Sequence, residues 1–186
     1  TNDGSLYVAG AFRSNISTFG THQLSNSDTT PRTLTTSPTS EAFLARMDPS
    51  NGNWMWVSGF EGQAHSDWSV AIEPSVSGGV YVAGNYASNS LVHDGRTLMS
   101  GWGDGGLTDA FVAEFNSTGA LLVYSSVFDP DASLEASDLA VTTDGLVLLA
   151  GHYIGQAAYA VPNKTVNEAP GYSEGFVAAW QPVNQT

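Results

Sequence analysis

The chain has 186 residues, of which 41% are hydrophobic and 11% aromatic, so it can bury a substantial core and is not of the disordered class. Its 18 acidic and 5 basic residues give a formal net charge of −13, which disfavours binding to nucleic acid or to anionic lipid surfaces. It has no cysteine, which excludes disulfides and thiolate chemistry, and no apolar run long enough to insert into a membrane.

Taken in order, the chain is a series of short strands. Apolar or alternating runs are separated by clusters of Gly, Asn, Asp, Ser and Pro, and helical periodicity is nearly absent, which is typical of an all-β protein. Turn signals such as Asn51-Gly52 and Asp144-Gly145 supply the positive φ angles that tight hairpins need. Ten strands are predicted, at residues 6–12, 42–47, 54–60, 66–72, 80–86, 110–115, 121–128, 138–142, 146–153 and 176–180.

Two short motifs recur three times in the same order. The first has the form Tyr-Val-Ala-Gly, and its copies end at Gly10, Gly84 and Gly151. The second has the form Ala-Phe-Val-Ala, and its copies contain Phe43, Phe111 and Phe176. Because the loops between the motifs vary in length while the strand pattern is kept, the chain is predicted to be a repeat protein.

Aligning the copies defines a unit of four strands. A strand with an early aspartate leads to the Tyr-Val-Ala-Gly strand, and a long loop connects this to the Ala-Phe-Val-Ala strand and then to an aromatic strand. The alignment places Asp67 and Asp138 at equivalent positions, where we expect their carboxylates to cap backbone N–H groups at a turn. The chain therefore divides into a partial unit at 1–64 with a Ser/Thr-rich loop at 13–40, a complete unit at 65–130 and a partial unit at 131–186.

The complete unit resembles the SBBP-type β-propeller repeat. The matching segments are Gly-Gly-Val-Tyr-Val-Ala-Gly-Asn-Tyr at 78–86, Asp-Ala-Phe-Val-Ala-Glu-Phe-Asn at 109–116 and Gly-Ala-Leu-Leu-Val-Tyr-Ser at 119–125. The resemblance implies four-stranded blades and, as in many members of that family, an extracellular or surface location. It supplies no catalytic residues.

The expected fold is an all-β, β-propeller-like array of four-stranded antiparallel blades, one complete and two partial. A closed propeller needs about 4 to 8 blades, so this array is too short to close alone. Two explanations remain open: the chain is a fragment of a longer propeller, or neighbouring copies complete its end blades. Open sheet edges are templates for strand addition, and such head-to-tail contacts grow into filaments when they do not close.

Glycosylation signals favour a secreted protein located outside the cell or on its surface. Four sequons are candidate N-glycosylation sites, at Asn15, Asn116, Asn163 and Asn184. The Ser/Thr-rich stretch offers candidate O-glycosylation sites at Thr29, Thr30, Thr33, Thr35, Thr36, Ser37 and Thr39. Covalent glycans are therefore expected on this chain.

No catalytic, metal or cofactor site is predicted. The four histidines, His22, His65, His93 and His152, lack the spacing of metal ligands, and His65 with Asp67 or Glu61 with Asp67 has no supporting hydrolase motif. Trp102, in a glycine-rich loop, is the candidate ligand contact.

We therefore expect a non-enzymatic structural or interaction protein that contacts copies of itself or other repeat-bearing chains through open blade edges. The alternative is a carbohydrate-binding module or a fragment of a carbohydrate-active propeller enzyme.

Overall fold

A computed structural model of the chain describes residues 4–27, 39–62, 65–100, 107–127, 132–155 and 173–180. These residues form strands β1 to β14, joined by turns and short connections, and contain no helix. No helix in this part of the chain is long and apolar enough to cross a membrane. The predicted all-β class is confirmed.

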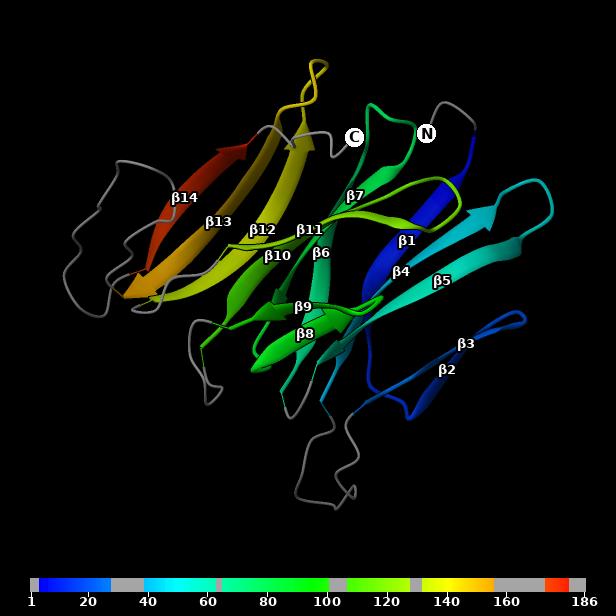
Figure 1. The fold of residues 1–186 in the computed structure, drawn as a ribbon, viewed down its shortest axis with the longest axis horizontal. Coiled ribbons are helices and arrows are strands. Elements are labelled where there is room, and N and C mark those ends of the chain that lie inside the picture. Colours follow the sequence, from blue (N-terminus) through cyan, green and yellow to red (C-terminus); the bar gives the residue numbers. More distant parts are fainter. Residues whose placement is uncertain are drawn as a thin grey trace.

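Three antiparallel sheets lie side by side like the blades of a fan (Figure 1). The first blade contains β1 (Leu6–Phe12), β4 (Glu41–Asp48) and β5 (Asn53–Gly62). The second has the order β11-β10-β7-β6, from β6 (Asp67–Pro74), β7 (Val80–Tyr86), β10 (Asp109–Phe115) and β11 (Leu121–Val127). The third contains β12 (Ala132–Val141), β13 (Val147–Gly155) and β14 (Ser173–Trp180). In the described residues one blade is therefore complete and two have three strands of their own repeat, as the sequence predicted.

Two hairpins were not among the predicted strands. One, β2 (Ile16–Phe19) with β3 (His22–Ser25), lies inside the segment predicted as a loop at 13–40. The other, β8 (Ser90–His93) with β9 (Arg96–Met99), follows the second Tyr-Val-Ala-Gly strand. The end of β5 pairs with β8, so the second repeat's hairpin extends the sheet of the first blade to the order β1-β4-β5-β8-β9.

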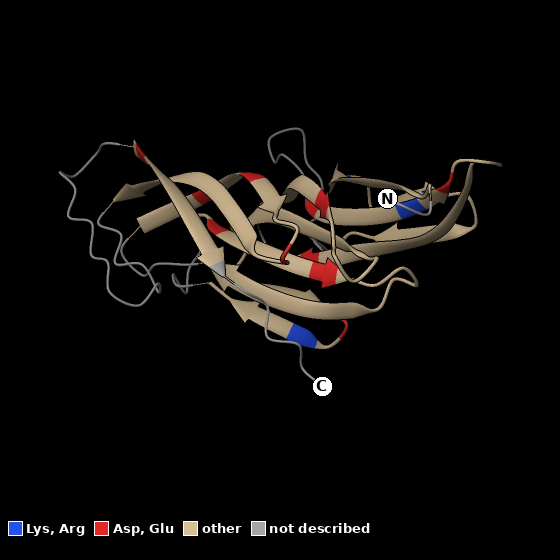
Figure 2. Ribbon diagram, turned by 90° about the horizontal axis from the view of Figure 1, so that it is seen from above, with Lys and Arg blue, Asp and Glu red and all other residues tan. Residues whose placement is uncertain are grey.

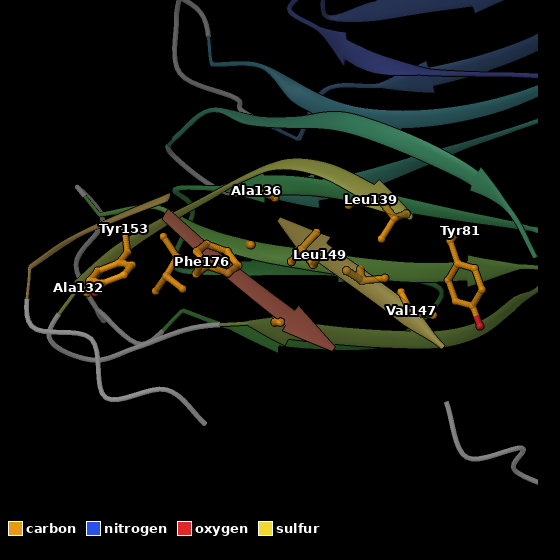
Figure 3. Packing of buried hydrophobic residues seen from close by; sticks show 13 residues of the cluster. Tyr81, Ala132, Ala136, Leu139, Val147, Leu149, Tyr153 and Phe176 are labelled. Atoms are coloured by element: carbon orange, nitrogen blue, oxygen red, sulfur yellow. The ribbon is translucent and has the colours of Figure 1, made fainter. Parts of the chain in front are cut away.

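The hydrophobic core lies in the two joints, a term we use for the interfaces between adjacent blades. The joint between the second and third blades contains Tyr81, Val112, Leu134, Leu139, Leu149, Tyr153 and Phe176 (Figure 3). The joint between the first and second contains Tyr7, Leu44, Phe60, Val82, Tyr86, Leu91, Phe111 and Phe115. Full burial of each large apolar side chain contributes roughly 1.5–3 kcal/mol, so the blades are stabilised by packing on one another.

The two repeated motifs meet across the sheet, glycine against phenylalanine. Gly10, Gly84 and Gly151 are the register partners of Phe43, Phe111 and Phe176 respectively. In the second blade a Cβ added at Gly84 would lie 2.5 Å from Phe111 Cε1 and 2.3 Å from the carbonyl oxygen of Trp68 in β6. Glycine is thus required where a neighbouring strand and a ring both approach the backbone.

The structure corrects the alignment of the aspartates. A bulge between Ser69 and Ala71 lies opposite Gly84, and a bulge between Ala136 and Asp138 lies opposite Gly151. Asp138 therefore aligns with Ala71. Asp67 pairs with Tyr86, and Leu134 pairs with the equivalent Tyr153, so Asp67 aligns with Leu134. The prediction that Asp67 and Asp138 are equivalent was wrong, because Asp67 and Leu134 are as far apart in the sequence as Gly84 and Gly151 and both strands have the bulge at the same position. Strand β12 begins at Ala132, earlier than expected.

Candidate functional site

The two joints are held by the same backbone contacts. The N–H of Asp67 in the second blade donates to the carbonyl of Ser40 in the first, with a distance of 2.7 Å. The N–H of Leu134 in the third blade donates to the carbonyl of Thr108, also at 2.7 Å. Each acceptor residue's own N–H donates to a serine hydroxyl on the next blade, Ser40 to Ser66 at 3.3 Å and Thr108 to Ser133 at 3.0 Å. A joint is therefore a repeated structural unit with a fixed direction along the chain.

Each blade presents equivalent apolar positions toward the blade that follows it. Three such positions can be followed through the register of the three blades. They are occupied by Tyr7, Ala9 and Leu44 in the first blade, by Tyr81, Ala83 and Val112 in the second, and by Leu148, Ala150 and Val177 in the third. The first two sets pack into the joints. In the third blade, by contrast, Val177 is 72% exposed, and Ile154, further along β13, is 48% exposed. We call the apolar residues of this surface, Leu148, Ala150, Ile154 and Val177, the trailing face. His152 lies between Ala150 and Ile154 on the same side of β13, with Nε2 3.7 Å from the Glu135 carboxylate.

The opposite surface of the first blade is also partly exposed. Leu6 aligns with Val80 and Val8 with Val82, both of which are buried in the first joint. Leu6 itself is 47% exposed. The β2–β3 hairpin covers another part of this surface, with the Phe19 ring centroid 5.1 Å from that of Phe43. We call the surface of Leu6 and Val8 the leading face.

In the described residues each end blade lacks one strand of the repeat, and the missing strand is a different one in the two blades. Strands β7 and β13 each pair on both sides, whereas among the described strands β1 pairs only with β4. The first blade thus lacks the counterpart of β6 and β12, and the third lacks the counterpart of β5 and β11, within the residues that the structure describes.

Asp67 is a buried cap at the first joint. Its carboxylate accepts hydrogen bonds from the N–H groups of Ala87 and Ser88, at 3.0 and 3.2 Å, and from the Ser88 hydroxyl at 2.7 Å. Burial raises its pKa to about 7 against these hydrogen bonds, which favour the charged form. The expectation that Asp67 caps backbone N–H groups is confirmed. Asp138 is exposed, and its Oδ1 accepts the N–H of Leu139.

A second buried acid lies beside this cap. Glu41 is 1% exposed and accepts hydrogen bonds from the backbone N–H and hydroxyl of Ser27, which ties the segment after β3 to the joint. The Ser27 hydroxyl also approaches the carbonyl of Gly62. A Cβ at Gly62 would lie 1.7 Å from Asp67 Oδ2, so the packing around the two carboxylates is tight.

A polar groove of about 510 Å³ lies where the β8–β9 hairpin crosses onto the first blade; its lining includes Ser58, Glu61, His93 and Asp94. His93 Nδ1 lies 2.8 Å from the Gly59 carbonyl, which can only accept, so Nδ1 carries a proton. In the neutral ring Nε2 is then the acceptor facing the Ser58 hydroxyl at 3.4 Å. Because the ring also packs on Phe60, we interpret His93 as a tie between the hairpin and the preceding blade.

The candidate modification sites have different environments. Asn15 is exposed just before β2. Asn116 is half-buried in the β10–β11 turn, where its Oδ1 accepts hydrogen bonds from the N–H groups of Thr118 and Ala120 and from the Thr118 hydroxyl. Thr39 is half-buried, and its carbonyl accepts a hydrogen bond from Asn26. The other candidates lie outside the described residues: Asn163, Asn184, Thr29, Thr30, Thr33, Thr35, Thr36, Ser37 and Trp102.

Acidic residues are spread over the blades and turns, with few basic residues among them (Figure 2). In the described part of the chain no three His, Asp or Glu side chains are grouped so that they could hold a metal ion. The carboxylate of Asp48 accepts hydrogen bonds from Ser50 and Asn51, and those from Ser50 lower its pKa, as in a self-contained turn.

No protein-family model and no curated protein matches this chain. The resemblance to SBBP-type repeats stays a prediction from the sequence motifs.

Proposed function

We propose that the chain is a non-enzymatic structural protein of the SBBP-type repeat class, which assembles with copies of itself or with other repeat-bearing chains through its end blades. One observation carries this proposal: the trailing face presents the positions that form both internal joints, yet Val177 is 72% exposed. An apolar sheet surface of this kind is typical of an interaction site.

The direction of the joints determines what such an assembly looks like. The trailing face and the leading face belong to opposite ends of the array, so contact between them is heterologous. Heterologous contacts form rings when the rotation closes and filaments when it does not. The proposed products are therefore open or closed stacks of blades.

The proposed environment is extracellular, with the chain carrying N-linked glycans. The exposure of Asn15 at the start of the β2–β3 hairpin supports this, because an acceptor asparagine must be reachable by the transferase. The net charge of −13 is compatible with a soluble surface and makes copies repel each other at low salt.

Light scattering coupled to gel filtration, with electron microscopy of the same fractions, tests the proposal. We expect species larger than a monomer, and more of them as NaCl screens the repulsion between copies. Val177→Asp should reduce the large species because it places a charge on the trailing face. Val76→Asp is the matched control, since Val76 is 64% exposed and lies at the β6–β7 turn. A monomer at all concentrations and salt levels would reject the proposal.

A further inference from the structure

We infer that the open edge of β1 accepts one extended strand of the β6 type, presented by a second chain built of the same repeat. This deepens the proposed function and rests on it, because it assigns the partner of one end blade. Strand addition at an exposed edge supplies backbone hydrogen bonds from the ladder and specificity from the side chains at alternate positions.

The first argument is the space beside Gly10. In the second and third blades the corresponding glycines face a strand carbonyl: an added Cβ would lie 2.3 Å from the oxygen of Trp68 at Gly84, and 2.1 Å from that of Glu135 at Gly151. At Gly10, within the described residues, the same Cβ would meet only the ring of Phe43, at 3.2 Å. The first blade thus has the glycine that admits a bulged strand, and no described residue occupies the position of that strand's carbonyl.

The second argument concerns the residues that follow β1. In the second blade Ser88 N–H and its hydroxyl bind the carboxylate of Asp67 on the added strand. The register of β1 and β7 places Ser14 at the position of Ser88, and each is followed by an asparagine. Ser14 is exposed, with its hydroxyl 2.7 Å from that of Ser17. A strand with an aspartate at the position of Asp67 would find the same cap on the first blade.

The third blade shows that this cap is selective. There the added strand β12 has Leu134 at the position of Asp67, and Gly155 stands at the position of Ser88. The serine and the aspartate are thus both present in the second blade and both replaced in the third. Because the first blade has the serine, the strand that fits its edge is of the β6 type rather than the β12 type.

The flanking surface suits an incoming strand as well. Leu6 on the leading face is 47% exposed, whereas its counterpart Val80 is 2% exposed beside β6. The Val70 bulge of β6 sits between Ser69 and Ala71, so the pattern to be matched is Asp-Trp-Ser, a bulge residue and then Ala-Ile. Because β6 of this chain already pairs with β7, the donor is a repeat-bearing chain whose strand of this type is unpaired.

A fluorescent synthetic peptide with the sequence of residues 66–75 tests the inference on the whole chain by fluorescence polarisation. We expect saturable binding of one peptide per chain. A peptide with Val70 deleted lacks the bulge, and a peptide with Asp67→Ala lacks the cap; each should bind about tenfold more weakly, or ~1.4 kcal/mol. The peptide of residues 131–142, which carries the β12 pattern, should also bind more weakly than the first.

Chain variants locate the site. Gly10→Val should abolish peptide binding, because its branched side chain occupies the place of the bulge carbonyl, while the folded blade needs only a shift of the Phe43 ring. Ser14→Ala should weaken binding of the Asp67 peptide but not of the Asp67→Ala peptide. Val76→Asp, at the exposed β6–β7 turn, should leave peptide binding unchanged.

The outcomes separate the inference from the proposed function. No saturable binding by the unmodified chain, or equal binding by a folded Gly10→Val chain, overturns the strand acceptor. If large species still form and respond to Val177→Asp, assembly through the trailing face stands without it. Peptide binding by a chain that stays monomeric supports the acceptor and overturns self-assembly alone.

Discussion

The ring of Phe111 lies against Gly84 so closely that no side-chain carbon fits between them: a Cβ on Gly84 would be 2.5 Å from Cε1 of the ring. The same pair recurs in each blade as Gly10 with Phe43 and Gly151 with Phe176. The two motifs that define the repeat are therefore the two halves of one cross-strand contact. Their recurrence in the sequence follows from a packing requirement of the blade.

We predict that Gly84→Ala destabilises the protein while Gly10→Ala is nearly neutral. The methyl group at Gly84 collides with the backbone of β6 as well as with the ring, and such overpacking costs about 1–3 kcal/mol or more. At Gly10 it meets only the end of the Phe43 ring. Urea unfolding of both variants measures the difference, and an equal loss of stability at the two positions would contradict this account.

Asp67→Asn is predicted to change how stability depends on pH. Burial raises the folded-state pKa of Asp67 to about 7 from an ordinary value of 3.8. The folded protein then holds one more proton than the unfolded chain between these values. The contribution of protonated Asp67 to the free energy of unfolding is complete below pH ~4 and is lost as pH rises through about 7.

The asparagine variant has no such proton to lose and can still accept the N–H groups of Ala87 and Ser88. Its unfolding free energy relative to the original chain should therefore increase from about pH 5 to about pH 8, by at most about 3 kcal/mol. Denaturant titrations of both proteins across this range measure the two unfolding free energies. Repulsion among the other acidic residues affects both proteins alike, so it cancels in the difference. A pH-independent difference would show that Asp67 is ionised throughout.

Arg46 and Trp56 are predicted to be energetically coupled, because both donate across the first joint to the carbonyl of Ser117. Both Arg46 and Trp56 of the first blade donate to it, Trp56 from Nε1 at 3.1 Å. Trp56→Phe and Arg46→Met should each cost about 1 kcal/mol, because one donor remains. The double variant should cost more than the sum, because it removes both. Urea unfolding of the single and double variants gives the coupling free energy from a double-mutant cycle. Additive losses of stability would show that the two donors act independently.

Glycan occupancy is predicted to be higher at Asn15 than at Asn116. Asn15 is exposed, whereas Asn116 uses its side-chain oxygen to hold the β10–β11 turn. Secretion of the chain from a glycosylating host, followed by peptide mass spectrometry, gives both occupancies. Asn15→Gln should remove most of the glycan mass carried by the described residues. Full occupancy of Asn116 in the folded protein would contradict the prediction.

The repeat made most of the fold predictable from sequence. All ten predicted strands exist, because each joint needs the same apolar positions and these recur around Gly10, Gly84 and Gly151. The hairpins were missed because their strands have four residues each and are largely polar. A signal was present: Asp94-Gly95, with φ angles of 46° and 72°, lies between two short runs as in a two-residue hairpin.

The interaction surfaces could be predicted only in part. Counting strands indicated unfinished end blades, but the register was needed to show that Val177 occupies the position of Val112, and Ser14 that of Ser88. The spacing of Gly84 and Gly151 places Leu134, and not Asp138, at the position of Asp67, and the bulges leave this alignment unchanged because both strands have one at the same place. Sequence spacing contains no independent sign of such an inserted residue.

The crossing of the β8–β9 hairpin has a consequence for how the chain can be divided. Because Glu61 and Gly62 of β5 pair with Val92 and Leu91, the sheet of the first repeat is finished by residues of the second. A truncation at the repeat boundary near residue 65 would remove the strand that pairs with the end of β5. The smallest fragment that keeps every strand pair of the first sheet therefore extends through Met99, so this folding unit ends later in the sequence than the first repeat does.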